Sequence, residues 1–182
     1  NPKPPLTMFI TYLPPTPSAL REKGAKVIIL KDERWAHPYI KTLNLLPNIL
    51  AKEKADRNNA YEAILVRDND IVSEASSSNV FAVFDGEIIT HPTDGKILAG
   101  ISRAVVLKIC EENDFKFKED YFTVEQLKEA DEVFLTNTSA EVLPVTNIEG
   151  DKVGNEKPGI ITNRLYELFL EEVKKDINNF KM

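Results

Sequence analysis

Strand-like and helix-like patterns of apolar residues alternate along this chain, and the alternation constrains its fold more than any other feature. Residues 80–84 and 87–90 are two β-type runs joined by Asp85-Gly86, a dipeptide typical of a two-residue hairpin turn. Residues 43–56 instead carry apolar side chains three and four positions apart, the spacing of one helix face. A chain of this mixed kind predicts an α/β fold around a curved or barrel-like sheet.

The same patterns predict the position of each element. We expect strands at residues 7–13, 26–30, 61–67, 71–74, 80–84, 87–90, 115–122, 132–135 and 142–148, and helices at 43–56, 101–113, 124–130 and 158–174. A further short helix should begin at a cap formed by Thr16 or Ser18 and end at Gly24. Two helices should pack apolar stripes on the core, the first through Leu45, Leu46, Ile49, Leu50, Ala51 and Ala55, the last through Ile161, Leu165, Leu168, Phe169 and Val173.

The first residues differ from the rest of the chain in composition. Five of the eleven prolines lie within residues 1–15, and proline fixes φ and removes a backbone donor. We therefore expect a proline-rich linker with one strand and one helix at 1–24, followed by a single domain at 25–182. The chain also lacks an initiator methionine. We expect it to be a fragment from which a preceding domain is missing.

Composition argues against several classes of function. The net charge of −6 makes a dedicated nucleic-acid binder unfavourable, because phosphate binding needs clustered cations. No apolar run is long enough to span a membrane. Cys110 is the only cysteine, and His37 and His91 are the only histidines, so we expect neither a disulfide framework nor a metal site. The lone cysteine and the missing secretion signal predict a cytoplasmic protein.

Four segments carry residue types suited to chemistry, and they are YIKTLNLL at 39–46, SEASSSNVF at 73–81, LAGISR at 98–103 and TNTSAEVLPV at 136–145. In the first, apolar neighbours can desolvate the amine of Lys41 and favour its nucleophilic form, although most isolated lysines are ordinary surface residues. In the second, Glu74 ends a predicted strand, where a partly buried carboxylate needs a cation or hydrogen-bond donors. An edge-strand glutamate followed by a plain polar turn is the ordinary alternative.

The other two segments suit a phosphate group. Gly100-Ile101-Ser102 stands where a helix begins, and the free N–H groups and dipole of a helix N-terminus attract anions. Thr136, Thr138 and Ser139 add hydroxyls near a strand end, although each alone is equally an ordinary capping residue. Together, a lysine for an aldehyde, a carboxylate for a ring nitrogen and a cradle for a phosphate are the parts of a pyridoxal phosphate pocket.

In order and spacing, the four segments resemble those of the fold-type IV pyridoxal phosphate enzymes. This family includes D-amino acid aminotransferases, branched-chain aminotransferases and aminodeoxychorismate lyases. The resemblance covers nearly the whole chain and matches the larger, C-terminal domain of the family. It implies a pseudo-barrel of mixed strands surrounded by helices, a homodimer, and a missing N-terminal domain that supplies most groups for substrate recognition.

The resemblance also implies a role for each matched residue. Lys41 is the lysine that binds the cofactor aldehyde covalently, and Glu74 is the carboxylate that pairs with the pyridine nitrogen. Leu98 packs on the cofactor ring, and Arg34 matches an arginine near the pocket of D-amino acid members. The residues that match the phosphate-binding positions are Gly100, Ile101 and Ser102 at the helix start and Thr138 and Ser139 in the later loop.

The implied reaction is transamination between an amino acid and a 2-oxo acid, with Lys41 as the general base for the Cα proton. SSSNVF, TNTSAEVLPV and a His-Pro pair before LAGISR favour the D-amino acid branch; a branched-chain aminotransferase comes second and a lyase third. Two other interpretations remain open, an inactive domain that keeps only the fold and a module that binds a phosphate ligand at Gly100. As a fragment, the 182-residue chain should bind cofactor weakly or not at all and should not transaminate at a useful rate.

Overall fold

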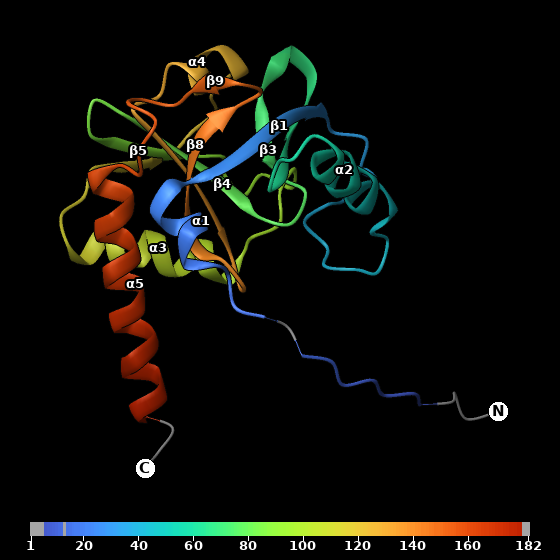
Figure 1. Cartoon of the computed structure of the whole chain (residues 1–182), viewed down its shortest axis with the longest axis horizontal. Helices are drawn as coiled ribbons and strands as arrows, with labels where there is room; N and C mark the ends of the chain where they lie inside the picture. The colour runs from blue at the N-terminus through green and yellow to red at the C-terminus, as the bar shows by residue number, and fades with distance from the viewer. Residues whose placement is uncertain (1–5, 13, 180–182) are drawn as a thin grey trace.

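A single curled sheet carries the helices on its outer surface in the computed structural model, which describes residues 6–12 and 14–179 (Figure 1). The strands follow the order β3-β2-β1-β8-β7-β4-β5-β6, and β9 pairs with β8. They are β1 (Ala25–Lys31), β2 (Glu62–Val66), β3 (Val72–Ala75), β4 (Asn79–Phe84), β5 (Glu87–Thr90), β6 (Phe117–Glu119), β7 (Glu132–Asn137), β8 (Glu141–Ile148) and β9 (Asp151–Lys152).

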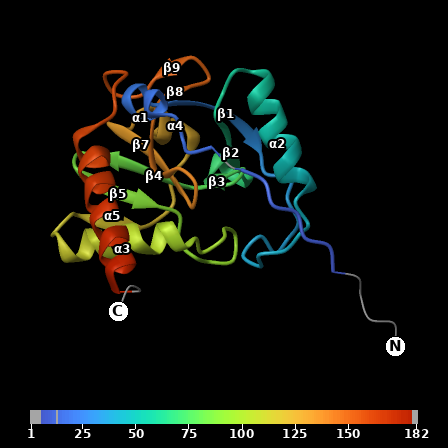
Figure 2. The same ribbon diagram turned by 60° about the horizontal axis from the view of Figure 1, so that its bottom comes forward.

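The longer helices lie in two groups on the outside of the sheet, whereas the short helix at 124–128 packs Leu127 into the apolar cluster inside the curl. The helices are α1 (Ser18–Lys23), α2 (Leu46–Arg57), the 3-10 turn η1 (Asp68–Asp70), α3 (Ile101–Glu112), α4 (Val124–Lys128) and α5 (Ile160–Asn179). α3 and α5 pack against each other and against β7, whereas α2 packs on β1 and β2 at the other side of the molecule (Figure 2). No helix in the described part of the chain combines the length and apolarity needed to cross a membrane.

The sheet curls until its two ends meet. Val72, at the start of the edge strand β3, donates its backbone N–H to the carbonyl of Phe122 at 3.0 Å, and Ile71 forms a bridge with Thr123. Both partners follow β6, the strand at the opposite end of the order. Parallel and antiparallel pairs are mixed around this curl. The predicted pseudo-barrel of mixed strands surrounded by helices is confirmed.

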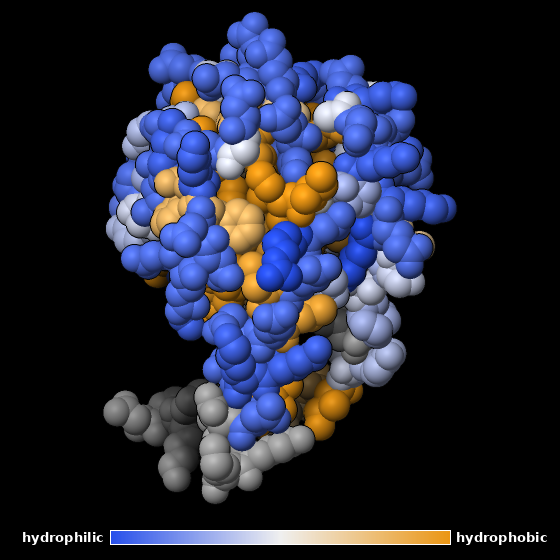
Figure 3. Space-filling model, turned by 90° about the vertical axis from the view of Figure 1, so that its left-hand side faces the viewer, coloured by the Kyte–Doolittle hydropathy of each residue, from blue (hydrophilic) through white to orange (hydrophobic). Residues whose placement is uncertain are grey.

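Two apolar layers hold the fold together. One fills the inside of the curl with short branched side chains from every part of the sheet, among them Val27, Ile64, Val72, Val80 and Val133. The other lies between the sheet and the helices α3 and α5, where the rings of Phe81 and Phe134 stack with centroids 4.7 Å apart. On the side of the molecule that carries α5, a seam of hydrophobic side chains runs between hydrophilic ones (Figure 3).

Most predicted elements are present with bounds that differ by one or two residues, but α2 begins three residues later and α5 ends five residues later than predicted. The hairpin at Asp85-Gly86 is confirmed, and both turn residues have the positive φ values, 48° and 81°, that such a turn requires. The short helix α1 ends before Gly24 as predicted, but Pro17 precedes it and no side chain caps it. The hydroxyl of Thr16 donates instead to the carbonyl of Ser139 at 3.0 Å.

Two strand predictions and one helix detail are wrong for physical reasons. Residues 7–12 are exposed and irregular because no neighbouring strand pairs with them, and residue 13 lies outside the described residues. The strand expected at 115–122 shrinks to β6 because its ladder partner among the described strands is the four-residue β5. In α5, Leu165, Leu168 and Phe169 are buried as predicted, but Val173 is 36% exposed because the helix runs past the sheet (Figure 1).

The leucine stripe predicted for residues 43–56 exists but is not covered. The buried residues of α2 are Ala51 and Ala55, which lie against β1 and β2. Leu46, Ile49 and Leu50 are 64%, 59% and 58% exposed. The prediction that this face packs on the core is therefore confirmed for Ala51 and Ala55 and wrong for Leu46, Ile49 and Leu50. A contiguous apolar surface of this kind is typical of an interaction site.

Candidate functional site

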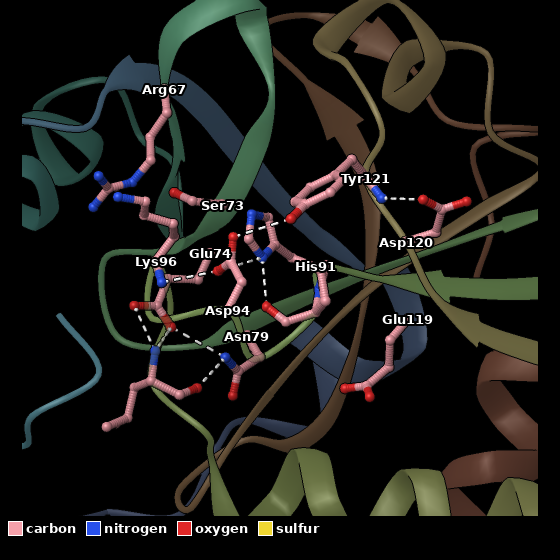
Figure 4. A network of polar contacts seen from close by, with 12 residues as sticks. Arg67, Ser73, Glu74, Asn79, His91, Asp94, Lys96, Glu119, Asp120 and Tyr121 are labelled. Atoms are coloured by element: carbon pink, nitrogen blue, oxygen red, sulfur yellow. Dashed lines mark hydrogen bonds and ion pairs between the residues drawn. The ribbon is translucent and has the colours of Figure 1, made fainter. Parts of the chain in front are cut away.

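Glu74 lies at the centre of a buried polar cluster near the end of β3 (Figure 4). Its carboxylate accepts hydrogen bonds from the side-chain amide of Asn79 at 3.0 Å and from the backbone N–H of Leu98 at 3.1 Å. Arg34 forms an ion pair with the other carboxylate oxygen, and both side chains are 6% exposed. The cation and the donors that the sequence required for a buried carboxylate are therefore present.

The serine turn between β3 and β4 brings Asn79 back beside Glu74. The hydroxyls of Ser76, Ser77 and Ser78 donate to the buried carboxylate of Glu62 at 3.1, 2.7 and 2.6 Å. These donors satisfy a carboxylate that is 1% exposed. The three serines are thus more than a plain polar turn, and Glu62 is a residue that the sequence analysis missed.

Burial dominates the protonation of Glu74. Loss of water around the carboxyl raises its pKa from 4.5 to about 7, although the charge and hydrogen bond of Arg34 pull the pKa down. The nearby charge of Asp32 adds a smaller upward push. Glu74 therefore exchanges its proton close to neutral pH, which is typical of carboxylates in functional sites.

This raised pKa predicts that Glu74 makes the chain less stable as the pH rises. Between pH 4.5 and about 7 the folded chain keeps a proton that the unfolded chain loses, so the free energy of unfolding falls across that range. The fall attributable to Glu74 is about 3 kcal/mol, at roughly 1.4 kcal/mol for each pH unit. Glu74→Gln lacks this pH-dependent fall. The free energy of unfolding of the variant, measured with urea, should therefore rise by about 3 kcal/mol relative to that of wild type between pH 4 and pH 8.

Glu87→Gln is the control, because Glu87 lies on β5 and its side chain is 40% exposed. It should keep the wild-type pH profile. Parallel pH profiles for wild type and Glu74→Gln would contradict the raised pKa.

The N-terminus of α3 lies on the other side of Asn79. α3 begins after Gly100 without a side-chain cap, and its first residue, Ile101, is 79% exposed. A Cβ at position 100 would lie 2.3 Å from Oδ1 of Asn79, so only glycine lets the helix start come this close. Asn79 also donates to the carbonyl of Leu98 at 2.8 Å. One amide thus links Glu74 to the free end of α3, and the sequence analysis gave Asn79 no role.

Of the three residues whose hydroxyls were predicted to bind phosphate, one lies near this helix end and two do not. Thr136 pairs with Asn79 across β4 and β7, and its buried hydroxyl oxygen has no hydrogen-bond partner within the described chain. Thr138 and Ser139 are exposed in the turn between β7 and β8. Among the described residues, no side-chain hydrogen bond joins either of them to α3. The geometry therefore singles out Thr136 from the three hydroxyls.

Lys41 lies in the irregular segment between β1 and α2 and is exposed. Within residues 6–12 and 14–179 it forms no side-chain hydrogen bond or ion pair. Its neighbours Ile40 and Leu45 are 45% and 44% exposed, so the predicted desolvation of its amine is wrong for the described chain. The structure joins Glu74, Arg34 and Leu98 directly but does not bring Lys41 into contact with them.

The segment that carries Lys41 is nevertheless attached to both sides of the Glu74 cluster. At the start of α2, the amide of Asn48 donates to the carbonyl of Ser76 at 2.8 Å. Upstream, the ring of Tyr39 would lie 3.5 Å from a Cβ at Gly95, so it packs on the loop that leads to Leu98. These contacts hold the segment along the rim of the cluster.

Comparison with known proteins shows the family. The family model described as class IV aminotransferase matches residues 1–148. A D-alanine aminotransferase from Staphylococcus epidermidis is 48% identical over 165 residues, which cover 91% of this chain and 58% of the relative. One from Staphylococcus haemolyticus is 51% identical over 148 residues, which cover 81% of this chain and 52% of the relative. The chain thus spans about half the length of the curated relatives it matches.

Solved structures of class IV aminotransferases have the same fold as this chain. A branched-chain amino acid aminotransferase from Escherichia coli superimposes with a TM-score of 0.78 at 31% identity, covering 85% of this chain and 53% of that one. The enzyme of the same name from Thermobaculum terrenum, in its PLP-bound holo form, gives a TM-score of 0.77 at 28% identity over 88% of this chain and 54% of that one. The match extends across the curled sheet and its helices, so this chain belongs to the class IV aminotransferase family.

Proposed function

We propose that this chain is the cofactor-binding part of a pyridoxal phosphate-dependent aminotransferase that transfers an amino group from a D-amino acid to a 2-oxo acid. The observation that carries the proposal is the buried carboxylate of Glu74, held beside the open N-terminus of α3. The D-alanine aminotransferases among its relatives favour D-alanine as the donor. The sequence motifs favour the same branch.

The residues present fit a phosphorylated pyridine ring. The start of α3 offers N–H groups that no side chain caps, and the glycine before it leaves room that a Cβ would fill. The unpartnered hydroxyl of Thr136 supplies a further donor close to Asn79. The buried carboxylate of Glu74 is suited to a protonated ring nitrogen.

Pyridoxal phosphate, when bound, supplies the electron sink that stabilises the charge left when a Cα proton departs. Lys41 would remove and return that proton through its Nζ atom. Glu74 would keep the pyridine nitrogen of the cofactor protonated, and Leu98 would lie against the ring. The phosphate would be held by Gly100, Ile101 and Ser102 at the start of α3, with the hydroxyl of Thr136 as a further donor. The resemblance to the family adds Thr138 and Ser139 from the β7–β8 turn.

The proposal includes a cytoplasmic homodimer. The exposed apolar surface around Leu46 and Leu50 supports an assembly that covers it. Cys110 is the single cysteine of the chain, so the chain carries no internal disulfide framework, which suits a reducing compartment.

The test uses the natural protein that contains this chain. We expect added pyridoxal phosphate to produce the visible absorbance of protein-bound cofactor. With 2-oxoglutarate as acceptor, kcat/KM for D-alanine should exceed that for L-leucine at least tenfold, about 1.4 kcal/mol in transition-state binding.

Each alternative gives a different result. Preference for L-leucine would make the protein a branched-chain aminotransferase, the name carried by the solved neighbours. Substrate consumption that needs no 2-oxo acid would make it a lyase. Absence of cofactor absorbance would leave an inactive domain, or a phosphate-binding module if inorganic phosphate still protects the fold against heat.

A further inference from the structure

One guanidinium joins two buried carboxylates beside the proposed ring-nitrogen site. Arg34 donates from Nε to Oδ1 of Asp32 at 2.9 Å and from Nη2 to Oδ2 at 2.7 Å. Its third nitrogen, Nη1, donates to Glu74. The side chains of Asp32, Arg34 and Glu74 are 0%, 6% and 6% exposed. The two-pronged contact with Asp32 fixes the plane of the guanidinium, and therefore the direction of the bond to Glu74.

Asp32 is itself held in place by the sheet. Its backbone N–H donates to the carbonyl of Val66, the last residue of β2, at 2.7 Å. The hydroxyl of Ser73, next to Glu74 on β3, lies 3.2 Å from Oδ2 of Asp32. Arg67 places Nε 2.9 Å from the same oxygen and forms an ion pair with it. Charges of alternating sign thus run from Arg67 through Asp32 and Arg34 to Glu74.

We infer that Asp32 and Arg34 are positioning residues for Glu74: Asp32 fixes Arg34, and Arg34 holds the Glu74 carboxylate in one orientation and favours its charged form. The inference rests on the proposed function, in which that carboxylate pairs with a protonated ring nitrogen. It assigns Arg34 a role through Glu74 in place of a direct contact with cofactor or substrate.

The charge of Arg34 favours the ionised form of Glu74, against the burial that raises the pKa of this carboxyl. The other groups bonded to the carboxylate, the amide of Asn79 and the N–H of Leu98, are neutral donors. Asp32 contributes a like charge that raises the pKa of Glu74, so it favours ionisation only through Arg34. A lysine at position 34 would keep one charge but would lose the planar fork that reaches both carboxylates.

The experiment follows the titration of Glu74 in this chain without cofactor. Glutamate labelled with 13C at the side-chain carboxyl gives NMR signals whose shifts report protonation, and Glu74→Gln identifies the signal of Glu74. Arg34→Gln should raise the midpoint of that titration by about 1–3 pH units. Arg34→Lys should raise it less, and it serves as the test if Arg34→Gln does not fold. Arg57→Gln, which removes an exposed arginine of α2, should leave it unchanged.

Asp32→Asn separates positioning from simple charge. If Asp32 acts only as a nearby negative charge, its removal should lower the midpoint of Glu74. If it fixes Arg34, the midpoint should rise, because the guanidinium loses the partner that directs it. A fall in Asp32→Asn would remove Asp32 from the inference, and an unchanged midpoint in both Arg34 variants would overturn it entirely.

A second measurement separates this inference from the proposed function. In the natural protein with cofactor, Arg34→Gln should lower kcat at least tenfold with little change in KM, and Arg34→Lys should recover part of the loss. An equal effect on KM would instead indicate direct contact with substrate and overturn the inference. If no cofactor binds while the carboxyl titration moves as expected, the proposed function fails and the positioning of Glu74 stands.

Discussion

Lys41→Ala is expected to lower the transamination rate of the natural protein by about 10²–10⁴-fold, the usual contribution of a positioned general base. The stability of the fold should hardly change, because Lys41 is exposed and has no side-chain partner among the described residues. Lys54→Ala is the matched control, since Lys54 is an exposed lysine of the adjacent helix α2. Steady-state kinetics with D-alanine and urea unfolding measure the two quantities.

A small primary amine added to Lys41→Ala should restore part of the rate, because it replaces the missing base in solution. Wild-type turnover in Lys41→Ala would assign proton transfer to another residue. A large loss of stability would show that Lys41 is part of the fold.

Glu74→Gln is expected to keep cofactor binding but to lower turnover by about 10²–10³-fold, the usual cost of removing one preorganised electrostatic contact in an active site. The amide preserves the shape of the side chain but leaves Arg34 without its second carboxylate. Glu132→Gln is the control: Glu132 accepts N–H bonds from Ile161 and Thr162 at the start of α5, so its loss should lower stability only. Normal turnover in Glu74→Gln would make Glu74 an ordinary strand-end glutamate.

Local patterns predicted the sheet because each strand carries its own signal. The turn at Asp85-Gly86 requires positive φ at both residues, and the Asp-Gly dipeptide alone predicts such a turn. Strand length at an edge depends instead on the partner, which is why β6 is shorter than its alternating pattern. The burial of a helix face also depends on what packs there, so the pattern in α2 identified the leucines but not their exposure.

The sequence predicted a site residue only where its residue type and its position in a strand together require bonding partners. A carboxylate at the end of a buried strand needs donors, and Glu74 has them. Asp32, Glu62 and Asn79 escaped notice because their importance lies in contacts between segments far apart in the chain. An Asp two residues before an Arg was the one local signal that could have indicated the pair at 32 and 34.

We propose that the segment at the rim of the Glu74 cluster brings Lys41 to a cofactor held by Glu74 and the start of α3. Borohydride reduction of the natural protein loaded with pyridoxal phosphate fixes the cofactor to the amine that holds it, and peptide mapping then locates the added mass. We predict that the mass lies on Lys41 in wild type and that labelling is lost in Lys41→Ala. A label on Lys52, Lys54 or Lys96 would contradict the account.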